Sequence, residues 1–550
     1  MMAADAPDTM SRVSTAGMHA ERKKFRKSLF RLDLVVFTVA AFVSVDGIAA
    51  MAAYGGGQTL FWIAALIVVY LIPYGMIVAE MGSTFPMEGG PYAWVRMAFG
   101  RLPAALTAFL YGASNPIWIG GTLAATCVAA IDSLVLPAGH PLGTAASIAV
   151  GLAVVWVTVM SSTVEMKYGK LTGWIGTIAR LLTLLLFLTF VVVFLFEHGK
   201  PAGTVTVSDL RPTLVGFLGV IGLLQFNFIG FELSSGAAEE MTNPKKDVPK
   251  MILRSGLIAT LVTGALILGV LLVVNGTMLS SVAGFTDAYA SVSGVLGGAQ
   301  TAFNWFVCLL IILVIISAGG VWQQGGVRIG AVAALDGAAP LWFGKFNKQG
   351  TPLTMNLFSG ALGSVLVISV FLIAHGSVAT YFTLVISCVV SLTALGYVFQ
   401  FPAILMLRKK YPSHHRPYRV PGGSVFLWIC VAAVEIITLI SVTTFLWPGL
   451  LNNLLGQPYS MQDTWGVSRA TYEIVSLGVD GFIVFVAVLF WAIGRRNLRR
   501  GVVADGDLLA IDPELGSSPQ ETSGSVDAPA MIATEAAAAI PGDAGSSSAA

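Results

Sequence analysis

Charged residues are scarce in this chain of 550 residues. Asp, Glu, Lys and Arg together make up 11% of it, whereas hydrophobic residues make up 56%. About one quarter of a typical soluble domain is charged, and those residues cover its water-facing surface. The composition therefore excludes a soluble globular protein and predicts a membrane protein, because only a lipid bilayer solvates so much apolar surface.

Cysteine and the motifs of enzymatic chemistry are scarce as well. The four cysteines lie inside apolar runs without CxxC or His-rich spacing, so we expect neither a disulfide framework nor a metal site. No HExxH, nucleophile-elbow or P-loop motif occurs, which argues against an enzyme and against ATP-driven pumping. We expect no cofactor and no nucleic-acid partner.

Long apolar runs dominate what is present. A membrane-spanning helix needs about 20 apolar residues, and the runs are continuous, without the alternation of a β-barrel. The sequence therefore predicts an all-α integral membrane protein with twelve transmembrane helices. The predicted segments are 32–54, 58–82, 103–133, 143–161, 171–196, 212–240, 251–275, 296–324, 353–374, 377–407, 424–447 and 474–494.

The positions of the basic residues support this count through the positive-inside rule. With the N-terminus inside and each segment crossing once, only Lys200, Arg211 and Arg469 fall outside. A miscounted helix would exchange the sides of every later loop. We therefore expect a multi-pass protein of the cell (inner) membrane, in contact with membrane lipids, with both termini cytoplasmic.

Two tails flank the predicted twelve-helix membrane domain at 31–500. Residues 1–30 form a basic cytoplasmic tail. Residues 501–550 are rich in Ala, Gly, Ser, Asp and Glu, contain no Lys or Arg, and cannot bury a core. We expect this second tail to be disordered and cytoplasmic.

Glycine and a carboxylate occur together near the middle of two segments. The first segment has Asp46-Gly47, and the sixth has Gly230 and Glu232. Transporters interrupt helices at such places and expose main-chain groups to a polar substrate. Asn115 precedes a proline inside the third segment, and we expect it to line the same pocket because a mid-helix proline leaves a carbonyl free.

Three ionisable residues are central in their segments: Asp46, Arg180 and Glu232. A charge inside the membrane is costly and usually functional. One interpretation is a structural ion pair, such as Asp46 with Arg180. The other is that the three residues line the path of the substrate and the coupling ion. Glu435 and Asp480 lie in the last two segments, outside the repeat, and are interpreted as structural.

Several motifs resemble those of the amino acid–polyamine–organocation superfamily, over about residues 30–495. The sixth segment and its exit match the pattern FxGxE…AEExxNPxxxxP between Phe228 and Pro249. The stretch from Trp322 to Gly350-Thr351-Pro352 also has family-like spacing. Further family-like stretches are Ala79-Glu80, Glu88-Gly89-Gly90 and Arg416 to Gly422.

The resemblance implies a five-plus-five inverted-repeat core with broken helices 1 and 6, plus two extra helices. A bundle of helices 1, 2, 6 and 7 would rock against helices 3, 4, 8 and 9. Phe226 and Trp322 would act as aromatic gates, with packing as the alternative for Trp322, and Glu232 would sense protons. The substrate would be gripped by Val43, Ser44, Asp46, Gly47, Phe226, Ile229 and Gly230.

Asp46 departs from the family pattern, which usually has a Gly- and Ser-rich run there. An anionic Asp46 would repel a substrate carboxylate and attract an ammonium or guanidinium group. If Asp46 is protonated, or neutralised by Arg180, a zwitterionic amino acid fits as well.

Arg180 aligns with a lysine that occupies the sodium position in sodium-independent members of the family. A fixed cation there repels sodium, so we expect sodium independence. Because arginine stays protonated, any coupled proton must be carried by Asp46 or Glu232, whereas an exchanger needs no carrier.

Three hypotheses follow for the function. The first is a secondary transporter of amino acids that works by alternating access, either proton-coupled or by exchange. The second is a transporter of polyamines or other organic amines with the same fold. The third is a transporter-like sensor or channel that does not turn over. No oligomeric state is predicted.

Overall fold

The computed structural model describes residues 45–87, 89–163, 166–198, 205–230, 232, 244–274, 279–348, 350–374 and 377–500, without the side chains of 166–170 and 244–255. Every regular element in these ranges is a helix. Val43, Ser44 and both tails lie outside the described residues.

The first half of the described chain runs from α3 to α13. Its elements are α3 (Val45–Gly55), α4 (Gln58–Leu66), the π-helix η1 (Ile67–Leu71), α5 (Ile72–Thr84), α6 (Gly90–Phe99), α7 (Arg101–Trp118), the π-helix η2 (Ile119–Leu123), α8 (Ala124–Leu134), α9 (Thr144–Ser161), α10 (Met166–His198), the 3-10 helix η3 (Val207–Leu210), α11 (Leu214–Asn227) and α13 (Pro244–Val273).

The second half runs from α14 to α22. Its elements are α14 (Gly284–Val292), the 3-10 helix η6 (Ser293–Ala299), α15 (Gln300–Leu335), the 3-10 helix η7 (Leu341–Gly344), α16 (Leu353–Ile373), α17 (Val378–Tyr397), α18 (Gln400–Lys410), α19 (Gly423–Leu446), α20 (Leu450–Leu454), α21 (Met461–Trp465) and α22 (Arg469–Arg499).

Ten helical stretches among the described residues are long and apolar enough to cross a membrane. They coincide with ten of the twelve predicted segments. The other two predicted segments, 32–54 and 212–240, hold the shorter helices α3 and α11 and extend beyond the described residues. The all-helical membrane fold is confirmed, and the count of twelve and the inverted repeat stay predictions.

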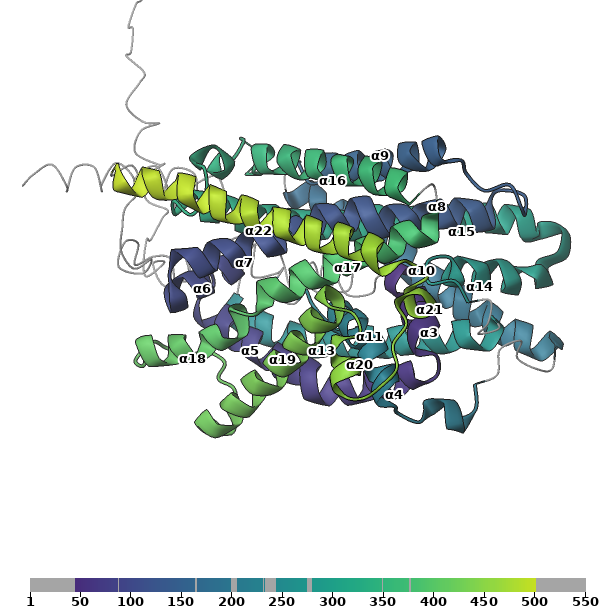
Figure 1. Cartoon of the computed structure of the whole chain (residues 1–550), viewed down its shortest axis with the longest axis horizontal. Coiled ribbons are helices and arrows are strands. Elements are labelled where there is room, and N and C mark those ends of the chain that lie inside the picture. The colour runs from purple at the N-terminus through teal and green to yellow at the C-terminus, as the bar shows by residue number, and fades with distance from the viewer. Residues whose placement is uncertain are drawn as a thin grey trace, which may run out of the picture.

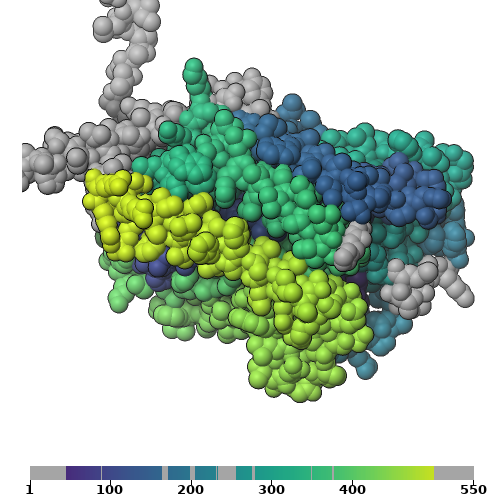
Figure 2. Space-filling model, turned by 45° about the horizontal axis from the view of Figure 1, so that its top comes forward, coloured from purple at the N-terminus to yellow at the C-terminus, as the bar shows by residue number. Residues whose placement is uncertain are grey.

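The long helices run roughly side by side along the longest axis of the molecule (Figure 1). In that view α6 and α18 lie toward one end, and α14, α20 and α21 lie nearer the other. Figure 2 shows α22, in yellow, along the outside of the bundle. The bundle therefore has two ends, as a membrane-spanning protein requires.

Burial separates central from peripheral spans. In the most apolar window of Arg101–Leu134, and in that of Val378–Lys410, 83% of the residues are buried, against 28% for Arg469–Arg499. The long α7 and α17 lie within these two central spans. Apolar side chains on the peripheral spans face the surroundings, which suits hydrocarbon rather than water.

Two of the spans contain a π-helical turn. The turn η2 begins at Ile119, three residues after Pro116, which lies inside α7 and supplies no backbone N–H. The turn η1 precedes Pro73 at the start of α5. Such turns are rare in helices and frequent at functional sites, and both change the direction of the side chains that follow them.

A buried carboxylate anchors one end of the bundle. Glu80, at 0% side-chain exposure, accepts hydrogen bonds from Arg408 Nε at 2.8 Å and Nη2 at 2.5 Å. Its Oε1 lies 3.6 Å from Arg416 Nη1, and its Oε2 accepts from the backbone N–H of Val420 at 2.7 Å. Glu80 thus fastens α5 to α18 and to the loop after α18.

Asp336, just after α15, forms a second anchor. Its Oδ2 accepts from Tyr92 at 2.5 Å and from Arg96 Nε at 2.8 Å, and its Oδ1 lies 3.2 Å from Arg101 Nη2. Burial and the adjacent Asp336 carboxylate raise the pKa of Tyr92, so this phenol stays protonated and donates. The anchor joins α15 to α6 and α7.

We predict that Glu80→Ala strongly destabilises the protein. It leaves Arg408 and the Val420 N–H buried without their partner, and breaking a buried pair costs about 3–5 kcal/mol. The matched control is Glu473→Ala, which removes an exposed pair with Arg469 at 3.1 Å that contributes about 0–1 kcal/mol. Thermal unfolding in detergent measures both variants, and equal melting temperatures would contradict the anchoring role.

Candidate functional site

Asp46 lies in the first turn of α3 with 1% exposure. Its Oδ2 accepts hydrogen bonds from Trp118 Nε1 at 2.8 Å and from Thr122 Oγ1 at 2.6 Å. Trp118 ends α7 and Thr122 belongs to η2, so the π-helical turn after Pro116 carries one of the donors. This carboxylate joins the start of α3 to the middle of a central span.

Arg180 on α10 is buried at 0% exposure, and its positive charge interacts with the carboxyl group of Asp46. The structure thus brings two of the three predicted intramembrane charges into one electrostatic group. A cation so near Asp46 offsets part of the cost of burying the carboxylate.

Glu232 is the centre of a cage of tyrosines and is itself 0% exposed. Tyr111 donates to its Oε1 at 2.8 Å, Tyr397 donates to the same oxygen, and Tyr74 donates to Oε2. The three phenols come from α7, α17 and α5. A carboxylate accepts several hydrogen bonds and donates none, so the three phenols are matched partners for the oxygens of Glu232.

The helix before Glu232 is interrupted. α11 ends at Asn227, and residues 228–230 are not helical. Gly230 has a φ of +123°, which favours glycine, and its N–H donates to Tyr74 at 3.2 Å. Ile229, inside the interruption, is buried. A break in this segment agrees with the predicted mid-membrane interruption.

The interrupted end of α11 faces the start of α3. A Cβ placed on Gly47 would lie 3.7 Å from Asn227 Nδ2. The two predicted interruption regions are therefore adjacent within the described residues, although Val43 and Ser44 of the first region are outside them.

An unbroken row of aromatic rings connects the two carboxylates. Trp118, the donor to Asp46, lies 6.3 Å from Phe226 and 5.6 Å from Trp322 between ring centroids. Trp322 in turn stacks at 6.0 Å on Tyr111, a donor to Glu232. The two predicted gates thus contact the same indole, and Trp322 is only 4% exposed.

Asn115 contacts the main chain of Trp322. Its Nδ2 donates to the main-chain carbonyl of Trp322 at 3.1 Å. A Cβ on Gly326, one turn after Trp322, would come within 1.8 Å of the same Nδ2, so only glycine leaves room for this contact. The structure therefore places Asn115 against the gate, where it fixes the main chain of α15.

Four polar residues of the site escaped the sequence reasoning: Thr122, Tyr74, Tyr111 and Tyr397. Each lies inside an apolar segment, where a buried tyrosine or threonine hydroxyl needs a hydrogen-bond partner. The one sequence signal that points to the three tyrosines is therefore a lone tyrosine in the interior of a membrane segment. The convergence of these tyrosines on Glu232, and the contact of Thr122 with Asp46, are visible only in three dimensions.

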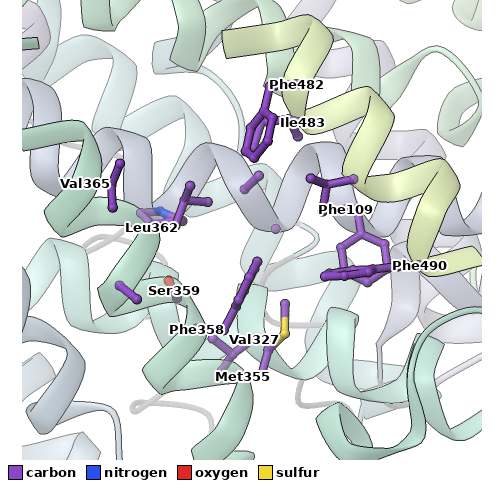
Figure 3. A pocket seen from close by; sticks show the side chains of 15 residues that line it. Phe109, Val327, Met355, Phe358, Ser359, Leu362, Val365, Phe482, Ile483 and Phe490 are labelled. Carbon is purple, nitrogen blue, oxygen red and sulfur yellow. The ribbon is translucent and has the colours of Figure 1, made fainter. Parts of the chain in front are cut away.

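An apolar cavity of about 320 Å³ lies apart from these carboxylates. α7, α15, α16 and α22 line it, with Phe109, Phe358 and Phe490 among its walls (Figure 3). Val365 and Phe482 on its rim are exposed to the surroundings. A cavity with these walls suits hydrocarbon and offers little to a polar substrate, so we place the site at the aromatic row.

Comparison with known proteins identifies the class of the molecule. Several membrane-spanning helices around buried charges define a multi-pass membrane transporter, and relatives of the chain carry transporter names. The family model described as amino acid permease matches residues 29–461. The chain belongs to this family, and its resemblance to the amino acid–polyamine–organocation superfamily is confirmed.

Three relatives illustrate the family. An uncharacterized transporter of Legionella pneumophila is 29% identical over 74% of this chain and 89% of its own length. A probable agmatine/putrescine antiporter of Lactococcus lactis is 29% identical over 76% and 87%. A probable polyamine transporter of Arabidopsis thaliana is 25% identical over 68% and 72%.

We predict that Tyr111→Phe lowers the free energy of unfolding more than Tyr381→Phe does. Both changes remove one buried hydroxyl, but Tyr381 donates to the carbonyl of Gly120, a neutral acceptor. A hydrogen bond to a charged group contributes about 1.5–3 kcal/mol, against about 0.5–1.5 kcal/mol for a neutral pair. Thermal unfolding in detergent compares the two, and equal losses would contradict a stronger hydrogen bond to Glu232 than to the carbonyl of Gly120.

Proposed function

We propose that this protein is a secondary transporter of small organic amines, such as diamines or guanidino-amines, and works by alternating access. The observation that carries the proposal is the aromatic row between two buried carboxylates, Asp46 and Glu232. A substrate with a cationic group at each end matches this arrangement of charges, and its methylene chain matches the rings between them.

The rings favour the same substrates. Ammonium and guanidinium groups are attracted to the faces of tryptophan, tyrosine and phenylalanine, by about 0.5–2 kcal/mol each. Phe226 and Trp322 both contact Trp118, and the two tryptophans are buried while Phe226 is half-buried, which strengthens such contacts. Two of the relatives are named for agmatine and putrescine or for polyamines.

Main-chain groups would complete the site. Gly47 at the start of α3 and the interruption at Phe226, Ile229 and Gly230 lie close to this row, so their backbone N–H and C=O groups are available to a bound substrate. Val43 and Ser44, which precede α3, are proposed to belong to the same shell. Asn115 would act by positioning Trp322, the proposed gate opposite Phe226.

Arg180 determines in this proposal whether transport requires sodium. A buried cation beside Asp46 repels sodium, so transport is sodium-independent. An arriving ammonium group competes with Arg180 for Asp46, which links substrate binding to movement of α10. Because Arg180 keeps its proton, a proton-coupled cycle would use Glu232 or Asp46 as carrier, and an exchange cycle would use none. Both termini are proposed to be cytoplasmic.

Amino acid transport is the second candidate, and the description of the family favours it. In amino acid transport the positive charge of Arg180 would compensate the negative charge of Asp46, and the substrate carboxylate would bind main-chain N–H groups beside Gly47. The two candidates differ in what they require of the Asp46 charge, so a single neutral substitution separates them.

We predict that Asp46→Asn weakens putrescine and agmatine transport and spares leucine. Asparagine still accepts from Trp118 and Thr122, but loss of one charged contact lowers amine affinity about ten- to hundredfold. Uptake and counterflow in proteoliposomes measure this, with Asp480→Asn, a buried carboxyl on α22 hydrogen-bonded to Ser391, as the matched control.

Other outcomes separate the remaining hypotheses. Unchanged amine transport together with lost leucine transport would overturn the amine assignment and support amino acids. Ligand-induced thermal stabilisation without counterflow of any of these compounds would contradict transport and indicate a sensor.

A further inference from the structure

The apolar cavity between α7, α15, α16 and α22 is a site that the transport proposal leaves unused. Its volume of about 320 Å³ is about twice that of an apolar cavity of about 150 Å³ that binds benzene. Figure 3 shows Phe109, Phe358 and Phe490 around it. Voids larger than a water molecule are few in protein interiors, so a space of this size indicates an occupant.

Water is a poor occupant of this cavity. Ser359 is the only lining residue with a hydroxyl, amide or charged side chain, and the structure describes all of the lining residues. Its hydroxyl already donates to Gln323 Oε1 at 3.0 Å. A buried water needs roughly two to four polar partners, and phenyl rings and aliphatic side chains supply none. An apolar occupant is therefore favoured.

The mouth of the cavity lies where a bilayer has its hydrocarbon core. Val365 and Phe482 on the rim are 62% and 56% exposed. Val365 is the thirteenth of the 21 residues of α16, and Phe482 is the fourteenth of the 31 residues of α22. Both therefore lie well inside apolar helices that are long enough to span a membrane. The exposed residues Ile368 and Phe485 nearby are apolar too, so the mouth opens to lipid chains.

The cavity is elongated along the helices. On α16 its lining extends from Met355 to Val365, which is about 15 Å at about 1.5 Å per residue. On α22 it extends from Phe482 to Phe490, which is about 12 Å on the same basis. The Phe490 ring lies 5.2 Å from that of Phe109 and 5.9 Å from that of Phe358, so aromatic rings close this end. A hydrocarbon chain parallel to the helices matches this shape.

Small residues of α7 form the inner wall. Gly112 and Ala113 line the cavity and are half-buried, although they belong to one of the most buried spans. A Cβ on Gly112 would lie 3.9 Å from the carbonyl oxygen of Gly326 on α15. Three residues on, Asn115 donates to the carbonyl of Trp322. The inner wall therefore belongs to the same stretch of α7 and α15 that carries the proposed gate.

We propose that this cavity binds one acyl chain of a bilayer phospholipid, and that the bound chain braces α7 against α15 and α16. The walls of an empty cavity lack dispersion contacts, and a chain lying along them restores these contacts. A ligand that binds the folded state stabilises it. The proposal goes beyond the proposed function and holds whichever solute is carried, because the ligand is a lipid and the site is apart from the aromatic row.

The test uses full-length protein in proteoliposomes that contain a phospholipid with a photoreactive diazirine in its acyl chain. Mass spectrometry locates the label after illumination. Phe109 is 4% exposed and lines the cavity, so only a chain inside the cavity reaches it. Leu372, an exposed residue of α16 outside the cavity, reports the surrounding lipid. We expect label at both residues in wild-type protein.

Ala361→Phe and Ala153→Phe form a matched pair of variants. Both alanines are exposed on spanning helices, but only Ala361 lines the cavity. We expect Ala361→Phe to lose most of the label at Phe109 and to keep the label at Leu372, and Ala153→Phe to keep both. In detergent, added phospholipid should raise the melting temperature of Ala361→Phe less than that of wild-type protein or of Ala153→Phe.

Two results would overturn the proposal. The first is label at Leu372 without label at Phe109 in wild-type protein, whether the cavity is empty or a second copy of the chain covers its mouth. The second is equal loss of the Phe109 label in both variants. Counterflow of putrescine and leucine is measured on the same vesicles. Its absence would contradict the proposed transport function and would leave the labelling result unaffected.

Discussion

Burying carboxylates in an apolar bundle is the constraint around which this structure is organised. An ionised carboxylate away from water is tolerated only with donors or cations around it. Asp46, Glu80, Glu232 and Asp336 each solve this with groups drawn from other helices. The charged residues that interrupt the apolar segments of the sequence therefore form the contacts that bring distant segments together.

The same contacts define what a transport cycle has to change. In the proposed scheme helices 1, 2 and 6 move against helix 3, yet Asp46 binds Trp118 and Glu232 binds Tyr111, both on α7. Rocking must break these bonds, and breaking them leaves buried charges without partners. A bound cation or a proton removes that penalty. Binding of substrate or of a proton is therefore coupled to helix movement, because it lowers the free-energy cost of leaving these carboxylates buried without partners.

The sequence predicted the parts of this molecule that depend on local pattern. Apolar runs located ten spans, and glycine beside a carboxylate predicted the interruption at Gly230, because both features need only neighbouring residues. It did not predict the tyrosine cage, since Tyr397 lies hundreds of residues after Tyr74 and Tyr111 and each resembles an ordinary membrane aromatic. It marked Glu80, Asp336 and Arg416 as family-like but did not predict the ion pairs of these two carboxylates, because pairing depends on how helix ends meet.

The sequence order of the Glu232 cage has a consequence for biogenesis. Chains are made and inserted from the N-terminus, so Tyr74 and Tyr111 enter the membrane before Glu232, but Tyr397 follows 165 positions later. Until α17 is made, the carboxyl lacks one of its three donors. A nascent chain halted before α17 would therefore hold an incompletely hydrogen-bonded carboxyl in the membrane and would be a ready substrate for membrane quality control.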